Sequence, residues 1–250
     1  MATYVLVHGA WHGGWCWRDV AERLRAYGHT VHTPTLTGLG ERAHLLTRAV
    51  DLDTHVRDVV AVLEYEDLTE ATLVMHSYAG MLLPAIAHEA GDRIARYAVI
   101  DGFLPLTGEI AVELLPERAA AHYRDSAAER GEGWWIPPRP MANLGVRDEE
   151  VISRVTPKLT PHPLSTYLEP ARIGLDDVAV QGWFALCSGW ASPFARFRAT
   201  AVHFGWQVDE LPADHEVMLT DPPALADYLN RLSRTAPAVR STPDVTEAAS

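Results

Sequence analysis

The chain has 250 residues, of which 48% are hydrophobic and 22% are charged. This composition is typical of a folded globular protein and argues against an intrinsically disordered chain. With 21 Lys and Arg against 33 Asp and Glu the net charge is -12, so we expect neither nucleic acid nor a membrane surface as a partner.

The N-terminal residues carry no recognisable targeting signal. Met1 leads almost directly into the apolar stretch TYVLVHG, and no apolar run reaches the roughly 18 residues that a membrane span needs. The two cysteines, Cys16 and Cys187, lack CxxC spacing, and we expect both to be buried free thiols. These features predict a cytoplasmic protein and leave a homodimer open.

Short apolar segments alternate with helical patterns along the chain. The predicted strands are residues 4–7, 29–34, 71–75, 97–101, 182–187 and 205–211. The predicted helices are residues 17–27, 52–63, 78–90 and a segment near the C-terminus. This alternation predicts an α/β fold with a six-stranded, mostly parallel sheet that has helices on both faces.

Residues 103–175 interrupt the alternation. They are rich in Pro and include the stretches GWWIPPRP and LTPHPL. An unstructured loop of this length is improbable inside a compact domain. We therefore predict a core formed by residues 1–102 and 176–234, a helical cap at 103–175 and a flexible tail at 235–250.

The stretch LVMHSYAGM places Ser77 between a strand and a helix. A nucleophilic serine on such a turn points its Oγ over the sheet edge, and small residues two before and two after it let the neighbouring chain pass closely. Ala79 fits this pattern, whereas Met75 stands where Gly is usual. Ser77 is therefore either a nucleophile or an ordinary helix N-cap.

His215 and Asp101 are the predicted partners of Ser77. His215 follows the last predicted strand, which is where the base of a Ser, acid, His series is found. The usual acid site, the loop CSGWASPF, is empty, because no Asp or Glu occurs between Val178 and Val208. Asp101 ends the strand after the serine and is the favoured acid over Asp209 and Asp214.

The glycine-rich loop HGAWHGG follows the first strand and is suited to stabilising an oxyanion. We predict the backbone N–H groups of Ala10 and Tyr78 as its donors. Aromatic side chains on this loop, on the cap and at their junction should line an apolar pocket. The predicted substrate-binding residues are Trp11, His12, Phe103, Trp134 and Trp135.

These stretches resemble those of the α/β-hydrolases. The segments VLVHGAWHGGWCW, GHTVHTPTLTGLGER, LVMHSYAGM and ADHEVML are similar to the group that contains plant methylesterases, salicylate-binding esterases and hydroxynitrile lyases. The resemblance implies a serine nucleophile at Ser77 and a base at His215. The acid at Asp101 is instead similar to that of some haloalkane dehalogenases, and the lyases use a lysine that Lys158, the one Lys of the chain, does not match.

The sequence thus predicts a serine hydrolase that cleaves a small hydrophobic or aromatic carboxylic ester, or a lactone, through an acyl-enzyme. It requires no metal and no organic cofactor. Two alternatives stay open. One is a lyase or cyclase that uses Ser77 and His215 for proton transfer, and the other is a ligand-binding homologue without catalytic activity.

Overall fold

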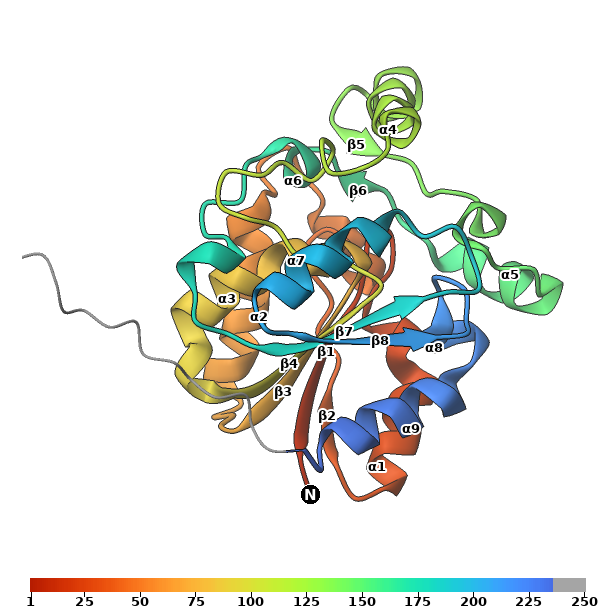
Figure 1. The fold of residues 1–250 in the computed structure, drawn as a ribbon. Helices are drawn as coiled ribbons and strands as arrows, with labels where there is room; N and C mark the ends of the chain where they lie inside the picture. Colours follow the sequence, from red (N-terminus) through yellow and green to blue (C-terminus); the bar gives the residue numbers. More distant parts are fainter. Residues whose placement is uncertain (236–250) are drawn as a thin grey trace, which may run out of the picture.

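A computed structural model describes residues 1–235 (Figure 1). Its main sheet has six parallel strands in the order β2-β1-β3-β4-β7-β8. The strands are β1 (Thr3–Val7), β2 (Thr30–His32), β3 (Ala71–His76), β4 (Ile94–Ile100), β7 (Gly182–Cys187) and β8 (Gln207–Leu211). All six predicted strands are confirmed. Most of the predicted tail, residues 236–250, lies outside the described residues.

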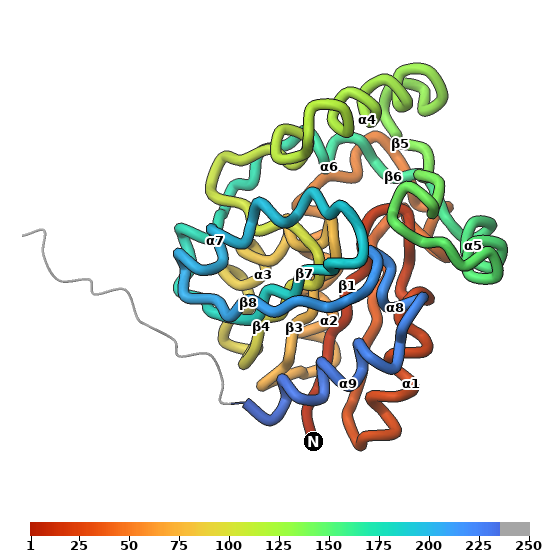
Figure 2. Tube along the Cα trace, turned by 45° about the vertical axis from the view of Figure 1, so that its right-hand side comes forward, coloured from red at the N-terminus to blue at the C-terminus, as the bar shows by residue number. Residues whose placement is uncertain are grey.

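Helices cover both faces of the sheet, as predicted. One face carries α2 (Leu52–Tyr65), α3 (Leu83–Ala90) and α7 (Phe197–His203); the other carries α1 (Arg18–Ala26), α8 (Val217–Thr220) and α9 (Pro222–Leu232) (Figures 1 and 2). Residues of β1 alternate between the two cores, with Val5 and Val7 in the first and Tyr4 and Leu6 in the second, because successive side chains of a strand point to opposite faces.

Residues 103–181, which lie between β4 and β7, are called the insert below. Most of the insert lies beyond the carboxyl ends of the central strands. Figures 1 and 2 place its elements around the same end of the molecule. These elements are α4 (Glu117–Arg130), β5 (Trp135–Ile136), α5 (Glu149–Val155), β6 (His162–Pro163) and α6 (Ser165–Leu168). The antiparallel pair β5–β6 was not predicted, since two-residue strands are too short to show a period in the sequence. The division of the chain at residues 103 and 175 stays a prediction.

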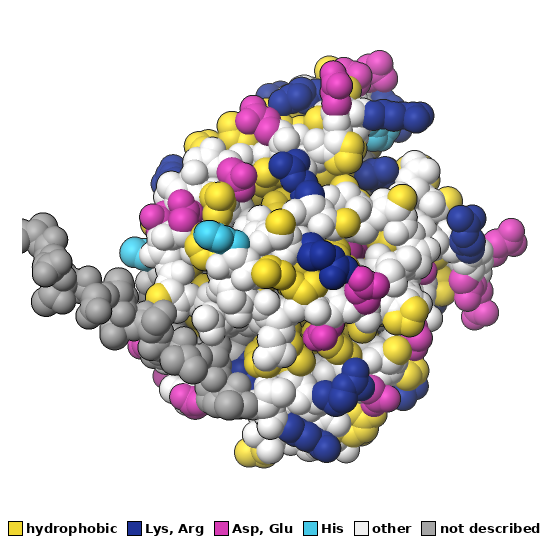
Figure 3. Space-filling model, viewed as in Figure 1, with side chains coloured by type: hydrophobic (Ala, Val, Ile, Leu, Met, Phe, Trp, Pro, Cys, Tyr) yellow, Lys and Arg dark blue, Asp and Glu magenta, His cyan; other side chains and the backbone are white. Residues whose placement is uncertain are grey.

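The polar surface is mixed in sign. On the face shown in Figure 3, acidic and basic side chains are interspersed. Among the described residues, no helix is long and apolar enough to cross a membrane. Cys16 and Cys187 are both free and buried, as predicted.

Candidate active site

Ser77 lies on a sharp turn at the carboxyl end of β3. Its φ of 55° is in the left-handed region, which is uncommon for a residue with a side chain. Two glycines make room for this turn: a Cβ on Gly102 would lie 2.7 Å from the Ser77 carbonyl oxygen, and one on Gly80 would lie 2.1 Å from the Phe103 carbonyl oxygen. The chain continues as a 3₁₀-helix, Ser77–Leu82, before α3 begins. The helix predicted at residues 78–90 is thus a 3₁₀-turn followed by an α-helix.

Met75 is accommodated two residues before Ser77. It pairs in register with Val7 of β1 and Val99 of β4 and is fully buried in the same core as both. A glycine at this position is therefore not required for the turn. The flexible thioether side chain of Met fills the space within the sheet.

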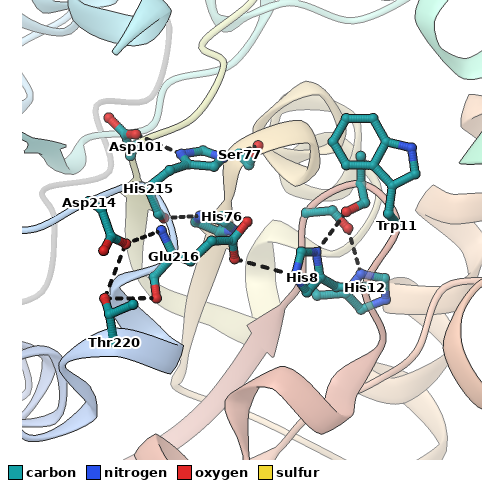
Figure 4. Close-up of polar contacts among 12 residues, drawn as sticks. His8, Trp11, His12, His76, Ser77, Asp101, Asp214, His215, Glu216 and Thr220 are labelled. Atoms are coloured by element: carbon teal, nitrogen blue, oxygen red, sulfur yellow. Dashed lines mark hydrogen bonds and ion pairs between the residues drawn. The ribbon is translucent and has the colours of Figure 1, made fainter. Parts of the chain in front are cut away.

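His215 connects Ser77 to Asp101 (Figure 4). Its Nε2 lies 2.9 Å from Ser77 Oγ, and its Nδ1 lies 2.7 Å from Asp101 Oδ2. The backbone of His215 is fixed as well, because its N–H donates to Leu144 O at 3.2 Å and its carbonyl accepts from His76 Nε2 at 2.9 Å. All three side chains of the series are buried. The geometry brings together the hydroxyl, imidazole and carboxylate that the sequence singled out.

Asp101 is surrounded by hydrogen-bond donors. The residue is fully buried and has a φ of 43°. Besides His215, its carboxylate accepts from the Cys187 backbone N–H at 3.2 Å, from Trp190 Nε1 at 2.9 Å and from Ser192 Oγ at 2.8 Å. The loop after β7, which lacks an acid, thus supplies the donors that hold the acid from β4.

The two histidines beside Ser77 titrate differently. Burial lowers the pKa of His215, but the hydrogen bond and the charge of Asp101 outweigh this effect, so that the pKa is raised above its usual value. Burial lowers the pKa of His76 well below its usual value. His76 is therefore neutral, and it carries its proton on Nε2 in order to donate to the His215 carbonyl.

The two predicted oxyanion donors belong to segments that lie next to Ser77. Tyr78 is the second residue of the 3₁₀-helix, where backbone N–H groups have no acceptor within the helix. Ala10 follows Gly9, whose Cβ position is 2.8 Å from Ser77 Cβ. The peptide after Ala10 is held by His12, whose Nδ1 donates to Ala10 O at 2.8 Å.

A cavity of about 260 Å³ opens onto Ser77 and His215. Its remaining lining residues are Trp11, Phe103, Leu115, Pro116, Ala119, Tyr123, Arg139, Asn143, Leu144, Tyr167, Trp190, Ala191, Pro193 and Phe194. Most of these side chains are apolar or aromatic, which is typical of a pocket for a small organic ligand. Trp11 and Phe103 lie in its wall, and their contact with a substrate stays a prediction.

Three predicted substrate-binding residues do not line this cavity, and the prediction is corrected for them. His12 belongs to the glycine-rich loop itself, but its side chain is buried and its Nε2 lies 3.4 Å from Glu216 Oε2. Trp134 lies at the surface of the insert, where Arg48 covers its ring with Cζ 5.2 Å from the ring centroid. Trp135 is in β5, opposite Pro163. Their aromatic character was a poor guide, because these rings meet protein neighbours instead of the cavity.

Several lining residues were missed by the sequence analysis. Tyr123 of α4 and Tyr167 of α6 meet edge to face at 5.1 Å between ring centroids, and Phe194 stacks at 5.5 Å on the His215 ring. Only Phe194 could have been found from the sequence, because it lies in the loop CSGWASPF after β7, where the acid of the series is usually found. The positions of the two tyrosines depend on how the insert folds back, which no local pattern encodes.

Among the described residues, no three His, Cys, Asp or Glu side chains are grouped in a way that could hold a metal ion. The candidate site is formed by the Ser77, His215 and Asp101 series, two candidate backbone donors and a mostly apolar cavity.

Known proteins resemble this chain in sequence and in fold. The model of the "Alpha/beta hydrolase family" matches residues 4–228. A "Carbendazim hydrolyzing esterase" of Nocardioides sp. (strain SG-4G) is 38% identical over 244 residues, which cover 93% of this chain and 100% of that protein. An extracellular alpha/beta-hydrolase from a Paenibacillus species superposes with a TM-score of 0.82 at 22% identity, covering 94% of this chain and 100% of that one. Tomato methylketone synthase I, solved with 2-tridecanone, has a TM-score of 0.74 at 19% identity, covering 93% and 97%.

Proposed function

The chain belongs to the alpha/beta hydrolase family, and on that premise we propose that it is a carboxylic ester hydrolase that acts through Ser77, His215 and Asp101. One observation carries the proposal: the unbroken series of hydrogen bonds from Ser77 Oγ through the His215 ring to Asp101. A relative that is similar over its full length carries the name of an esterase, which supports the same reaction class.

The proposed reaction begins with proton transfer from Ser77 to His215. As Nε2 of His215 takes the proton, Oγ forms a bond to the ester carbonyl carbon. The tetrahedral intermediate then expels the alcohol, which receives the proton from His215 and leaves an acyl group on Ser77. Water, deprotonated by the same imidazole, attacks the acyl carbon and releases the acid, and the proton returns to Ser77.

Asp101 has two functions in this reaction. Its carboxylate accepts a hydrogen bond from the Nδ1–H group of His215, which leaves Nε2 unprotonated and able to act as the base. It also stabilises the imidazolium that forms when His215 takes the proton from Ser77. The three further donors to Asp101 hold its carboxylate in place against the His215 ring.

The negative charge on the carbonyl oxygen needs preorganised donors. We assign this function to the backbone N–H groups of Ala10 and Tyr78, which flank Ser77. In other enzymes the loss of one such donor costs roughly 3 kcal/mol of transition-state stabilisation. Because both donors belong to the backbone, no side-chain substitution removes them directly.

The substrate class follows from the cavity. A volume of about 260 Å³ with walls formed by Trp11, Phe103 and Tyr167 is suited to a small hydrophobic or aromatic ester, or to a lactone. Carbendazim, which the Nocardioides relative is named for, is one compound to assay.

The first experiment compares the hydrolysis of p-nitrophenyl acetate by the wild type, Ser77→Ala and Asp101→Asn. We expect both variants to lose nearly all activity, and equal rates in all three proteins would overturn the proposal. Labelling with a fluorophosphonate, followed by mass spectrometry, tests the nucleophile itself. Modification at Ser77 supports an acyl-enzyme, whereas an unlabelled Ser77 would favour a lyase, a cyclase or a ligand-binding protein.

A further inference from the structure

Arg139 is the one permanently charged side chain among the residues that line the catalytic cavity. It comes from the insert, between β5 and a 3₁₀-turn at Met141–Leu144, and it is half-buried. The lining contains no Asp or Glu. Asp101 contacts Nδ1 of His215 and is not among the lining residues. A cation is an unusual component of a wall that is otherwise formed mostly by apolar and aromatic groups.

Arg139 lacks an acidic partner in the part of the chain that the structure describes. None of the ion pairs in this part includes it, and its Nε is buried without a hydrogen-bond partner. Its neighbour is the Tyr123 ring, whose centroid lies 5.8 Å from Cζ. By contrast, Arg42 pairs with Asp58 at 2.9 Å. The buried Nε of Arg139 is therefore a donor without an acceptor, and a buried polar group that is left without a hydrogen bond is costly.

The surroundings of Arg139 favour an anion. Asn143 and Tyr123 line the same cavity and carry amide and hydroxyl groups that can donate to an oxygen ligand. The Tyr123 hydroxyl also makes side-chain hydrogen bonds with Arg139 and Tyr167. The charge of Arg139 also acts within the site, since it opposes the rise in the pKa of His215. Planar guanidinium groups match carboxylates in shape and charge and bind them through two parallel hydrogen bonds.

We propose that Arg139 binds a carboxylate of the substrate, so that the enzyme prefers esters that carry a second, free carboxylate. This inference rests on the proposed function, because it names the substrate class of the same site. The ester group would lie at Ser77 while the free carboxylate contacts the guanidinium. The apolar walls would hold the carbon skeleton between the two.

Two esters of nearly equal shape test this proposal: monomethyl terephthalate, which carries a carboxylate, and methyl 4-nitrobenzoate, which carries a neutral nitro group in its place. In Arg139→Met we expect kcat/KM to fall about 10- to 100-fold for the first ester and to change little for the second. Arg139→Lys, which keeps the charge but not the planar fork, should recover part of the loss. Arg124→Met, at an exposed arginine of α4, is the matched control and should change neither rate.

Binding to the Ser77→Ala protein, measured by calorimetry, separates this inference from the proposed reaction. Adding Arg139→Met should weaken the binding of monomethyl terephthalate and leave that of methyl 4-nitrobenzoate unchanged. Equal losses for both esters, no loss, or no binding of the anionic ester would overturn the role of Arg139. If Ser77→Ala still hydrolyses the esters at the wild-type rate, the proposed function fails, and the binding comparison still decides on Arg139.

Discussion

The carboxyl ends of the central strands and the insert hold their residues in different ways. At the strand ends, Asp101 accepts four hydrogen bonds, and the His215 side chain is bonded at both ring nitrogens. In the insert, the cavity is lined by aromatic contacts and by Arg139, whose Nε has no partner. The reacting side chains at the strand ends are thus each held by several hydrogen bonds. The cavity wall, in contrast, contains a buried donor, Arg139 Nε, that has no hydrogen-bond partner.

The largest effect is expected from Asp101→Asn at the strand ends. The amide would turn an N–H toward Nδ1 of His215 and so favour the wrong tautomer of the imidazole. We expect kcat to fall by roughly 10³- to 10⁴-fold with the fold retained, as measured by ester hydrolysis and circular dichroism.

Asp214→Asn is the control for this experiment. Asp214 adjoins His215 in sequence, but its carboxylate accepts from the Glu216 backbone N–H and from Thr220 Oγ1. Its replacement should change kcat less than about threefold, because the Asp214 carboxylate has no hydrogen bond to His215 or Ser77 and an ordinary hydrogen bond contributes only about 1 kcal/mol. A larger loss in Asp214→Asn than in Asp101→Asn would reverse our assignment of the acid.

Substitutions at two glycines test how tightly the strand ends and the insert are packed. Gly80→Ala would place a Cβ 2.1 Å from the Phe103 carbonyl oxygen, so we expect the free energy of unfolding to fall by about 3 kcal/mol or more. Gly133→Ala in the insert has a φ of +77° but no heavy atom within 4 Å of the added Cβ, and should cost about 1 kcal/mol. Urea denaturation measures both, and equal losses would contradict the difference between the regions.

The pH dependence of hydrolysis reports on His215. Because the reaction needs the neutral imidazole, kcat/KM should rise with pH and level off above the raised pKa of His215. Below that pKa it should fall about tenfold for each pH unit. A plateau that extends to pH values well below 6 would exclude His215 as the base.

The smallest effect is expected from Trp134→Ala. This ring lies outside the cavity, so kcat/KM should change less than about twofold, while the lost contact with Arg48 should cost at most about 1 kcal/mol of stability. Trp190→Phe provides the contrast, since it removes one donor to Asp101 and should lower kcat about 3- to 10-fold. If Trp134→Ala slowed hydrolysis more than Trp190→Phe, our placement of the substrate would be wrong.

Some of these features could be predicted from the sequence, for physical reasons. The six strands are buried on both faces and therefore read as short apolar runs, and the catalytic candidates follow three of them. Asp101 was found by elimination, because the loop after β7 contains no carboxylate.

The cavity walls could not be predicted in the same way. Tyr123 of α4, Arg139 of the loop after β5 and Tyr167 of α6 lie in separate parts of the insert and meet only after it folds back over the sheet. The tryptophans of the stretch GWWIPPRP were expected at the cavity because of their residue type, but their positions are set by tertiary contacts with Arg48 and β6.

The backbone connection between Ser77 and Asp101 has a consequence for how this protein could evolve. The Phe103 N–H donates to the Ser77 carbonyl at 3.2 Å, and the Asp101 N–H donates to the Ala185 carbonyl at 2.8 Å. The spacing of nucleophile and acid is thus set by main-chain atoms of β7 and of the turns that follow β3 and β4. Mutant libraries confined to positions such as Leu115, Arg139 and Asn143 should therefore alter which compounds are accepted while the reaction chemistry is inherited unchanged.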